Sequence, residues 1–237
     1  MVNKIISMSV WGDNPRYIVG ARRQVELAKE FYPDWKVRIY VDDKSKLADL
    51  DVELIEVTDG SYGMYWRFEP MFEDENNIVM VRDSDSRITI REQMAVNEWL
   101  ESDKKFHTFK DHEAHYEFMI IGCAFGYKGK LPKEAHDQMK NYIKNRGFYT
   151  GDQLYLQEVI WPLVKDDAIV HSMHEGWFGE TRKQLDNKYS FCGNGYTEND
   201  LPLYPPRFKD FKGWDQENIP AHTKFDKGTF KPKKGIL

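Results

Sequence analysis

The sequence has little cysteine, and it has no long apolar run. Its two cysteines, Cys123 and Cys192, cannot form a disulfide framework, and no cysteine or histidine spacing typical of a zinc site is present. No apolar stretch approaches the roughly 18 residues of a membrane-spanning helix. Because the chain also lacks a signal-peptide pattern, we expect a cytoplasmic protein. It contains no internal repeat and no low-complexity segment.

A basic excess is also lacking. The net charge is −5 and the isoelectric point is near 5.8, so the composition does not predict a nucleic-acid partner. With 237 residues, 41% hydrophobic and 31% charged, the chain can form one large globular domain or two small ones. Aromatic residues are abundant at 14%; such residues either fill a core or line a site for sugars and bases.

The N-terminal part of the chain alternates between strand and helix patterns. Residues 4–10 and 37–41 have the apolar, β-branched character of strands, and a third strand is expected over 51–57. Pro15 follows an Asn or Asp cap, and apolar residues then recur at helical spacing up to Tyr32. A strand, a helix and a strand within about 40 residues indicate a βαβ unit, and therefore a parallel sheet with helices on its faces.

The most informative stretch is residues 78–87, Ile-Val-Met-Val-Arg-Asp-Ser-Asp-Ser-Arg. Apolar residues that run into a charged cluster are typical of a buried strand whose polar end reaches the edge of a sheet. Because residues i and i+2 of an extended chain point the same way, Asp83 and Asp85 could face one ligand, and two carboxylates suit Mg²⁺ or Mn²⁺. Arg82 and Arg87 would hold the pair or meet a phosphate. The alternative is a solvated strand end with local salt bridges.

Three polar segments follow three of the expected strands. They are the loop 11–15 (Trp-Gly-Asp-Asn-Pro), the pair Asp42 and Asp43, and the pair Asp83 and Asp85. Ligands of open α/β sheets bind outside the carboxyl ends of the strands. We therefore expect the three segments to form a ligand site along one rim.

The rest of the chain predicts further helices and strands. Helices are expected over 64–72, 91–100, 133–145 and from a cap at 150–153 to Trp161, and strands over 106–109, 118–127 and 168–170. Glycines inside 118–127 indicate close approach of a ligand or another backbone, and the polar loop 111–115 could reach the site. Periodicity weakens late in the chain, so residues 1–178 are expected to form the catalytic domain and residues 179–237 an irregular extension packed on it.

Several motifs stand in an order that resembles a known enzyme family. They are a strand before Trp-Gly-Asp-Asn-Pro at 11–15, Trp-Arg-Phe at 66–68, Val-Arg-Asp-Ser-Asp-Ser-Arg at 81–87, Gly-Asp-Gln at 151–153 and Val-Ile-Trp-Pro at 159–162. The set resembles small GT-A-fold glycosyltransferases, viral and bacterial ones distantly related to glycosyltransferase family 8, over roughly residues 3–175. The resemblance implies the α/β, Rossmann-like fold of nucleotide-diphospho-sugar transferases, with a mixed, mostly parallel sheet flanked by helices.

The resemblance also implies a metal cofactor. Asp83, Asp85 and, at the end of a late strand, His171 would bind Mn²⁺ or Mg²⁺, which would hold the diphosphate of a nucleotide sugar. Asp83 and Ser84 would also contact this donor. A divalent metal offsets the negative charge that develops on a departing diphosphate. His171 could instead be a hydrogen-bonded surface histidine, and His174 is a second candidate ligand.

Further residues are implied for the nucleotide, and the family habit favours a uridine donor. Arg67 would bridge to phosphate or ribose with its planar guanidinium, and Trp11 would pack on the base or ribose. The alternatives are an arginine on a helix surface and a tryptophan that caps the core. Asp42 or Asp43 would either contact the base or ribose or only cap a turn.

Asp152 matches an acidic motif that faces the donor sugar and acceptor in family 8, and Asp152 and Asp85 are the catalytic candidates. Asp152 could also cap a helix. Retaining members lack an obvious general base, whereas inverting ones need a carboxylate at the acceptor hydroxyl. We favour retention; if the reaction inverts, Asp111, Glu113 or Asp152 is the candidate base.

The sequence departs from family 8 after its late histidine. Family members continue with a Gly and a Lys-Pro-Trp that clamp the diphosphate; here Arg182 or Lys183 would take that role. The expected partners are a nucleotide sugar and a glycan or other hydroxyl acceptor, with neither nucleic acid nor a transmembrane segment. The alternatives are a nucleotidyltransferase, whose usual Gly-rich phosphate loop is missing after the first strand, and a non-catalytic binding module on the same fold.

Overall fold

The computed structural model describes residues 2–145, 149–172 and 191–204. The strands in this part of the chain are β1 (Asn3–Val10), β2 (Lys36–Val41), β3 (Glu53–Glu56), β4 (Asn77–Arg82), β5 (Phe106–Lys110), β6 (Ala124–Lys128) and β7 (Ala168–Ser172). They form one seven-stranded sheet in the order β3-β2-β1-β4-β6-β5-β7. Only the pairings of β6 with β4 and β5 are antiparallel within it. The predicted mixed, mostly parallel α/β sheet is confirmed.

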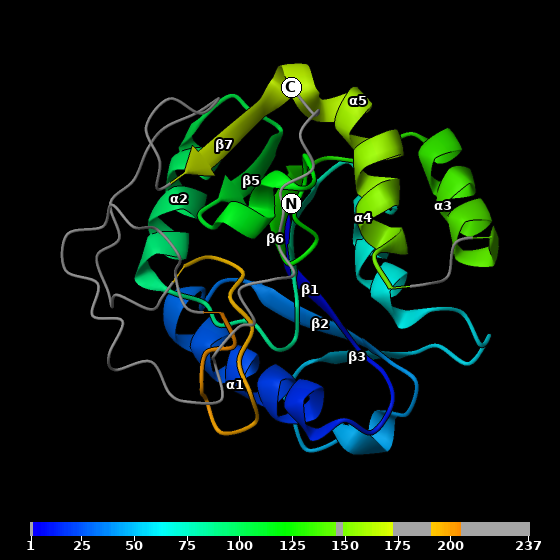
Figure 1. Ribbon diagram of the computed structural model, residues 1–237, viewed down its shortest axis with the longest axis vertical. Helices are drawn as coiled ribbons and strands as arrows, with labels where there is room; N and C mark the ends of the chain where they lie inside the picture. Colours follow the sequence, from blue (N-terminus) through cyan, green and yellow to red (C-terminus); the bar gives the residue numbers. More distant parts are fainter. Residues whose placement is uncertain (1, 146–148, 173–190, 205–237) are drawn as a thin grey trace, which may run out of the picture.

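Helices cover both faces of this sheet (Figure 1). The α-helices of the described chain are α1 (Pro15–Phe31), α2 (Ile90–Glu101), α3 (Lys133–Asn145), α4 (Gly151–Tyr155) and α5 (Trp161–Val164). Shorter turns of helix are η1 (Lys44–Lys46), η2 (Gly63–Phe72), η3 (Glu113–Tyr116), η4 (Leu156–Ile160) and η5 (Lys165–Asp167). In Figure 1, α1 and α2 lie on one side of the sheet, and α3, α4 and α5 lie on the other.

Helix α1 begins and ends where its sequence predicts. The side chain of Asn14 accepts a hydrogen bond from the backbone N–H of Arg16, and Pro15 occupies the first turn, where its missing N–H costs nothing. Ala21, Val25 and Ala28 form the buried stripe that packs on the sheet. This packing fixes the first turn of α1 above the carboxyl end of β1.

The chain changes direction between β1 and β4. From β1 it proceeds through α1 to β2 and then β3, whereas β4 lies on the other side of β1 and leads to β6, β5 and β7. Because β1, β2 and β4 are parallel, their carboxyl ends share one edge. In open α/β sheets this reversal of strand order, the switch point of the sheet, is the place where ligands bind.

Three predicted elements differ in extent from the observed ones. The third strand covers Glu53–Glu56 rather than 51–57, because the chain before it is still turning after η1. The strand expected over 118–127 is confined to Ala124–Lys128. It starts late because the backbone N–H of Ala124 donates to the carbonyl of Ile121 and closes a turn. The helix expected to run to Trp161 contains a π-helical segment, η4, between α4 and α5.

No helix in the described ranges is long and apolar enough to span a membrane. The boundary expected at residue 178 and most of the extension beyond it lie outside the described residues. Residues 191–204, the described part of that extension, form turns and one isolated bridge between Tyr196 and Pro202.

Candidate functional site

The loop after β1 and the end of β2 are held together at the shared edge. The side chain of Asp42 accepts a hydrogen bond from the backbone N–H of Gly12 at 2.8 Å, and it forms an ion pair with Lys46, also at 2.8 Å. Asp43 caps η1 by accepting from the N–H of Ser45. The sequence leaves open whether this pair contacts the base or ribose or only caps a turn. In the structure both aspartates make contacts that hold their own loops.

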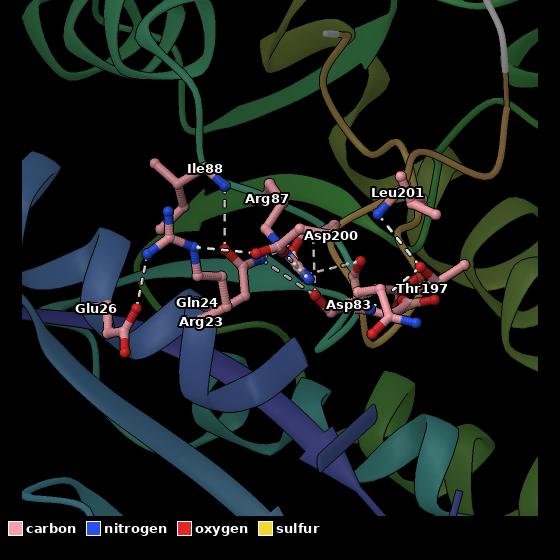
Figure 2. Close-up of polar contacts among 12 residues, drawn as sticks. Arg23, Gln24, Glu26, Asp83, Arg87, Ile88, Thr197, Asp200 and Leu201 are labelled. Atoms are coloured by element: carbon pink, nitrogen blue, oxygen red, sulfur yellow. Dashed lines mark hydrogen bonds and ion pairs between the residues drawn. The ribbon is translucent and has the colours of Figure 1, made fainter. Parts of the chain in front are cut away.

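Residues 83–87 form a tight turn and not the extended segment that the sequence suggests. The backbone N–H of Ser86 donates to the carbonyl of Asp83 at 3.1 Å. Gln24 of α1 fixes this turn: its amide nitrogen donates to the hydroxyl of Ser86, and its amide oxygen accepts from the N–H of Ile88 (Figure 2). The site is therefore built on a rigid loop supported by a helix.

Ser84 and Gly20 show how closely α1 approaches this turn. Ser84 is buried, and a Cβ on Gly20 would lie 2.6 Å from the carbonyl oxygen of Ser84 and 2.9 Å from the Cα of Asp85. Real Cβ atoms do not approach so closely, so a residue without a side chain is required at position 20. Ser84 thus presents its backbone to α1.

Arg67 of η2 joins two of the candidate carboxylates. Its guanidinium lies 2.5 Å from Asp83 and 2.8 Å from Asp152, and Arg67 is buried. Asp152 belongs to α4, which follows β6 in the chain, so the guanidinium connects two distant segments. Burial raises the pKa of Asp152, an effect that the charge of Arg67 opposes. Arg67 is therefore buried beside the aspartates and does not lie on a helix surface; its expected contact with phosphate or ribose stays a prediction.

Arg16 of α1 pairs with the third carboxylate, Asp85. Asp85 is 5% exposed, and burial together with the negative charge of Asp83 raises its pKa, although Arg16 opposes the shift. The two aspartates of the Asp-Ser-Asp motif are thus close enough to influence each other while each contacts a different arginine. The sequence alone did not identify Arg16. The local signal is its place directly after the proline that starts α1, because the first turn of that helix lies at the switch point.

Arg82 and Arg87 lie on either side of the aspartate pair in the sequence and make different contacts. Arg82 makes a fully buried ion pair with Glu92 of α2 at 2.9 Å, and Arg87 donates to the carbonyl oxygens of Asp85 and Ser86. Both guanidinium groups are occupied within the protein. Arg87 thus holds the acidic turn, as one of the two expected roles requires, whereas Arg82 connects β4 to α2 and β6 and does not contact the aspartate pair.

Residues 191–204 also reach the acidic turn, which the sequence did not reveal. The backbone N–H of Tyr196 donates to the carbonyl of Asp85 at 2.9 Å, and Asp200 pairs with Arg87 at 2.7 Å (Figure 2). The guanidinium of Arg87 lies over the ring of Tyr196, 5.0 Å from its centroid. The only local sequence signal is the turn-forming Gly-Asn-Gly at 193–195.

Trp11 is the aromatic side chain of the β1 loop. It is 37% exposed and stacks on Tyr17, with ring centroids 6.3 Å apart and planes 8° from parallel. Trp66 meets it edge-on, and a side chain on Gly63 would overlap its ring. Trp11 therefore lies at the rim of the site and does not cap the core.

Asp152 and Gln153 open α4 beside the turn that precedes β6. The side chain of Gln153 accepts from the N–H of Gly122 at 3.3 Å. A Cβ on Gly122 would overlap the amide of Gln153 and lie 3.1 Å from the guanidinium of Arg67. The glycine is thus explained by close approach, but of side chains and not of the ligand or backbone that the sequence predicts. Thr150 does not cap α4 through its side chain and has a φ of 75°.

His171 does not join the aspartate pair. It lies on β7, three strands away from β4 in the sheet order, which corresponds to about 14 Å at the usual strand spacing. It is fully buried, its ring packs on His107 and Phe109, and its Nε2 lies 3.6 Å from Glu98 of α2. The ring is thus buried between the sheet and α2 and is not the surface histidine of the alternative.

Asp111, a candidate base, is also committed elsewhere. Both of its carboxylate oxygens bind the buried guanidinium of Arg91, at 2.5 and 2.7 Å. His174, Arg182 and Lys183 lie outside the described residues.

The donor chemistry at the switch point fits a hard divalent cation. Within the described ranges, no group of three or more His, Cys, Asp or Glu side chains could hold a metal ion. Asp83 and Asp85 nevertheless suffice for Mg²⁺ or Mn²⁺ of the kind that binds one or two carboxylates and completes its shell with water and phosphate.

No protein-family model and no curated protein matches the chain, but solved structures do. The bifunctional IspDF from Campylobacter jejuni matches at 18% identity over 58% of this chain and 44% of that one, with a TM-score of 0.40. A glycosyltransferase involved in glycosylation of the PBCV-1 major capsid matches at 16% identity over 73% and 83%, with a TM-score of 0.43.

A third match is the 4-diphosphocytidyl-2C-methyl-D-erythritol synthase from Anaerococcus prevotii, at 11% identity over 72% of this chain and 87% of that one, with a TM-score of 0.45. The chain spans less than half of the first of these three structures, 44%. All three TM-scores lie below 0.5. These likenesses do not establish what this chain binds, so its function is argued from its own residues.

Proposed function

We propose that this chain is a metal-dependent glycosyltransferase that moves a sugar from a uridine-diphosphate sugar to a hydroxyl of a glycan or similar acceptor, with retention of configuration. One observation carries the proposal: Asp83, Asp85 and Asp152 are gathered by two arginines at the switch point of the sheet. That place is where such sheets bind ligands. Carboxylates and guanidinium groups together suit a metal-bound diphosphate.

Asp83 and Asp85 are the residues that would hold the metal, Mn²⁺ or Mg²⁺. A metal bound there offsets the negative charge that develops on the departing nucleoside diphosphate. The tight turn and its support by α1 keep the two carboxylates in place before the donor arrives. Such preorganisation reduces the cost of ordering the site on binding.

Arg67 and Asp152 would act next to the reacting sugar. Arg67 keeps Asp83 and Asp152 a guanidinium width apart, so a donor held at Asp83 places its sugar close to Asp152. Asp152 would orient the sugar and the acceptor hydroxyl. Trp11, with its exposed ring at the rim, would pack on the base or ribose of the nucleotide.

The contacts of two of the three candidate bases support retention over inversion. An inverting enzyme needs a carboxylate free to accept the proton of the acceptor hydroxyl. Asp111 is fully engaged by Arg91, and Asp152 is paired with Arg67. Neither of these two candidates is therefore a free base in the described part of the chain.

The test is calorimetric titration of UDP with Mn²⁺ present and again with chelator. UDP should bind only with Mn²⁺, and Asp85→Asn should weaken this binding by about 100-fold or more, since even outer-shell partners of metals contribute 10–100-fold. Asp34→Asn is the matched control, because Asp34 is also an ion-paired aspartate, with Lys4 at 2.5 Å, but precedes β2. It should leave UDP binding unchanged.

Turnover then identifies the reaction. Nucleoside-diphosphate sugars should be hydrolysed slowly or transferred to an acceptor with release of UDP. Consumption of a nucleoside triphosphate with release of pyrophosphate would instead identify a nucleotidyltransferase. If no nucleotide binds in a metal-dependent manner, the glycosyltransferase proposal is wrong and a binding module becomes the better description.

A further inference from the structure

The ion pair between Arg16 and Asp85 occupies the position that a metal would need. Arg16 donates to one carboxylate oxygen of Asp85, and Asp85 is almost completely buried. A guanidinium and a divalent cation repel each other, and both require the negative charge of this carboxylate. In this structure the cation that neutralises Asp85 therefore comes from the protein.

The surroundings of Arg16 leave it donors to spare. Its Nε is buried and has no hydrogen-bond partner in the structure, and 29% of its side chain is exposed. A buried donor without a partner is costly. A ligand that supplies acceptor oxygens next to Asp85 would satisfy it, and diphosphate oxygens are strong acceptors for guanidinium groups.

The net charge of the cluster explains why the nucleotide needs the cation. Three carboxylates, Asp83, Asp85 and Asp152, face two guanidinium groups, Arg16 and Arg67, which leaves a net charge of −1. The two negative charges of a nucleotide-sugar diphosphate would make this more negative, whereas a divalent cation bound with the diphosphate returns the cluster to −1. The diphosphate can therefore enter this buried site without adding uncompensated charge only when the cation binds as well.

We propose that Arg16 is an exchangeable counter-ion: it neutralises Asp85 in the nucleotide-free protein, competes with the divalent cation, and moves to the diphosphate when cation and nucleotide bind together. This inference rests on the proposed function and adds a coupling to it. Arg16 weakens the binding of metal alone and strengthens the binding of nucleotide in the presence of metal. Metal and nucleotide thereby bind as a pair.

The position of Arg16 permits this motion without unfolding. Its Nη2 would lie 3.0 Å from a Cβ at Gly195, which also approaches the carboxylate of Asp85. The glycine leaves room beside the ion pair. Arg16 lies in the first turn of α1, whose cap at Asn14 and buried stripe do not involve the Arg16 side chain, so the guanidinium can change partner while the helix stays in place.

The experiment measures Mn²⁺ binding to the full chain by the electron paramagnetic resonance signal of free Mn²⁺, with and without UDP. Arg16→Gln should bind Mn²⁺ alone about tenfold more tightly than the unmodified protein, and UDP with Mn²⁺ about tenfold more weakly, as expected for one charge-assisted contact. Arg16→Lys keeps the charge but loses the planar fork. It should retain the weak Mn²⁺ binding and lose part of the UDP affinity.

The matched control is Arg22→Gln on the same helix. Arg22 pairs with Asp49 at 2.5 Å, away from the acidic turn, so both affinities should stay unchanged. Equal Mn²⁺ affinity in the unmodified protein and Arg16→Gln, with UDP binding still metal-dependent, would overturn the counter-ion role and leave the proposed function intact. Absence of metal-dependent UDP binding from every variant would overturn both. Unchanged thermal unfolding and circular dichroism would show that each variant is folded.

Discussion

Asp111 and Arg91 form a buried ion pair whose disruption gives a sharp prediction. Asp111 directly follows β5, and its side chain is fully buried. Two nitrogens of Arg91 in α2 bind its two oxygens at 2.5 and 2.7 Å. The backbone N–H of Cys192 also donates to it at 3.3 Å. One carboxylate thus connects β5, α2 and residues 191–204.

The substitution Asp111→Asn keeps the size of the side chain and removes its charge. The guanidinium of Arg91, which is 1% exposed, then loses the negative charge of Asp111. Breaking a buried pair in this way costs about 3–5 kcal/mol of unfolding free energy. For a chain of this size each kcal/mol lowers the melting temperature by about 2–4 °C, so the expected decrease is about 6–20 °C.

Thermal and urea unfolding followed by circular dichroism measure this loss. The control is the double variant Arg91→Met with Asp111→Asn, in which no charge is left unpaired. Since replacement of a whole buried pair is often nearly neutral, the double variant should be more stable than Asp111→Asn alone. The coupling energy follows from the complete cycle with Arg91→Met.

The same variant separates a structural role from a catalytic one. If Asp111 is structural, Asp111→Asn should bind UDP and turn over normally at temperatures well below its melting point. An unchanged melting temperature, or a large loss of turnover in fully folded protein, would refute the structural reasoning. The second result would restore Asp111 as the general base of an inverting reaction.

Two further predictions concern residues packed beside the site. Gly122→Ala should lower the free energy of unfolding by about 1–3 kcal/mol, because the new methyl overlaps the amide of Gln153. In thermal unfolding, the added substitution Gln153→Ala should recover part of this loss. An unchanged melting temperature for Gly122→Ala alone would contradict the contact. Burial lowers the pKa of Lys110 to about 7. The unfolded chain therefore binds more protons between about pH 7 and 10, and the free energy of unfolding should rise with pH by at most ~1.4 kcal/mol per unit. Urea unfolding across this range should show that slope in the unmodified protein and not in Lys110→Met.

Local patterns made most of the fold predictable. The cap at Asn14, the helical spacing of apolar residues in α1 and the β-branched runs of β1, β2 and β4 act within a few residues, so their elements appear where predicted. The antiparallel direction of β6 depends on pairing with two strands distant in sequence. Its extent and orientation therefore could not be derived from its own residues.

The candidate site shows the same division. The rim that carries the loop 11–15, Asp42 and Asp83 follows from strand order alone, and the structure places these segments at one edge. The residues that pair with the carboxylates cannot be derived from strand order. Arg16 looks like an ordinary helix residue in the sequence, and Arg67 was expected to meet a phosphate or ribose and not two carboxylates. Only the packing of α1 and η2 against the turn creates these ion pairs.

The placement of His171 illustrates why a resemblance in motif order has limits. A histidine at the end of a late strand was expected at the metal, yet β7 lies at the edge of the sheet beyond β5 and its histidine is enclosed by Phe109 and His107. The distance between His171 and the aspartate pair is set by the order of the strands in the sheet, which the sequence does not reveal for the second half of the chain. In the described ranges the acidic pair is left with arginines as its neighbours.

Residues 191–204 complete the site and cannot be regarded as a separate appendage. The N–H of Tyr196 binds the carbonyl of Asp85, and Asp200 neutralises Arg87, which in turn holds the carbonyls of the acidic turn. Without these residues, the carbonyl of Asp85 and the guanidinium of Arg87 would each lose a partner. Both groups belong to the turn on which the proposed metal site depends. Because the turn is fixed from one side by α1 and from the other by residues 191–204, the geometry of the carboxylates depends on both ends of the described chain. A shortened chain that ends before residue 191 should therefore lose metal-dependent UDP binding even where the sheet itself still folds.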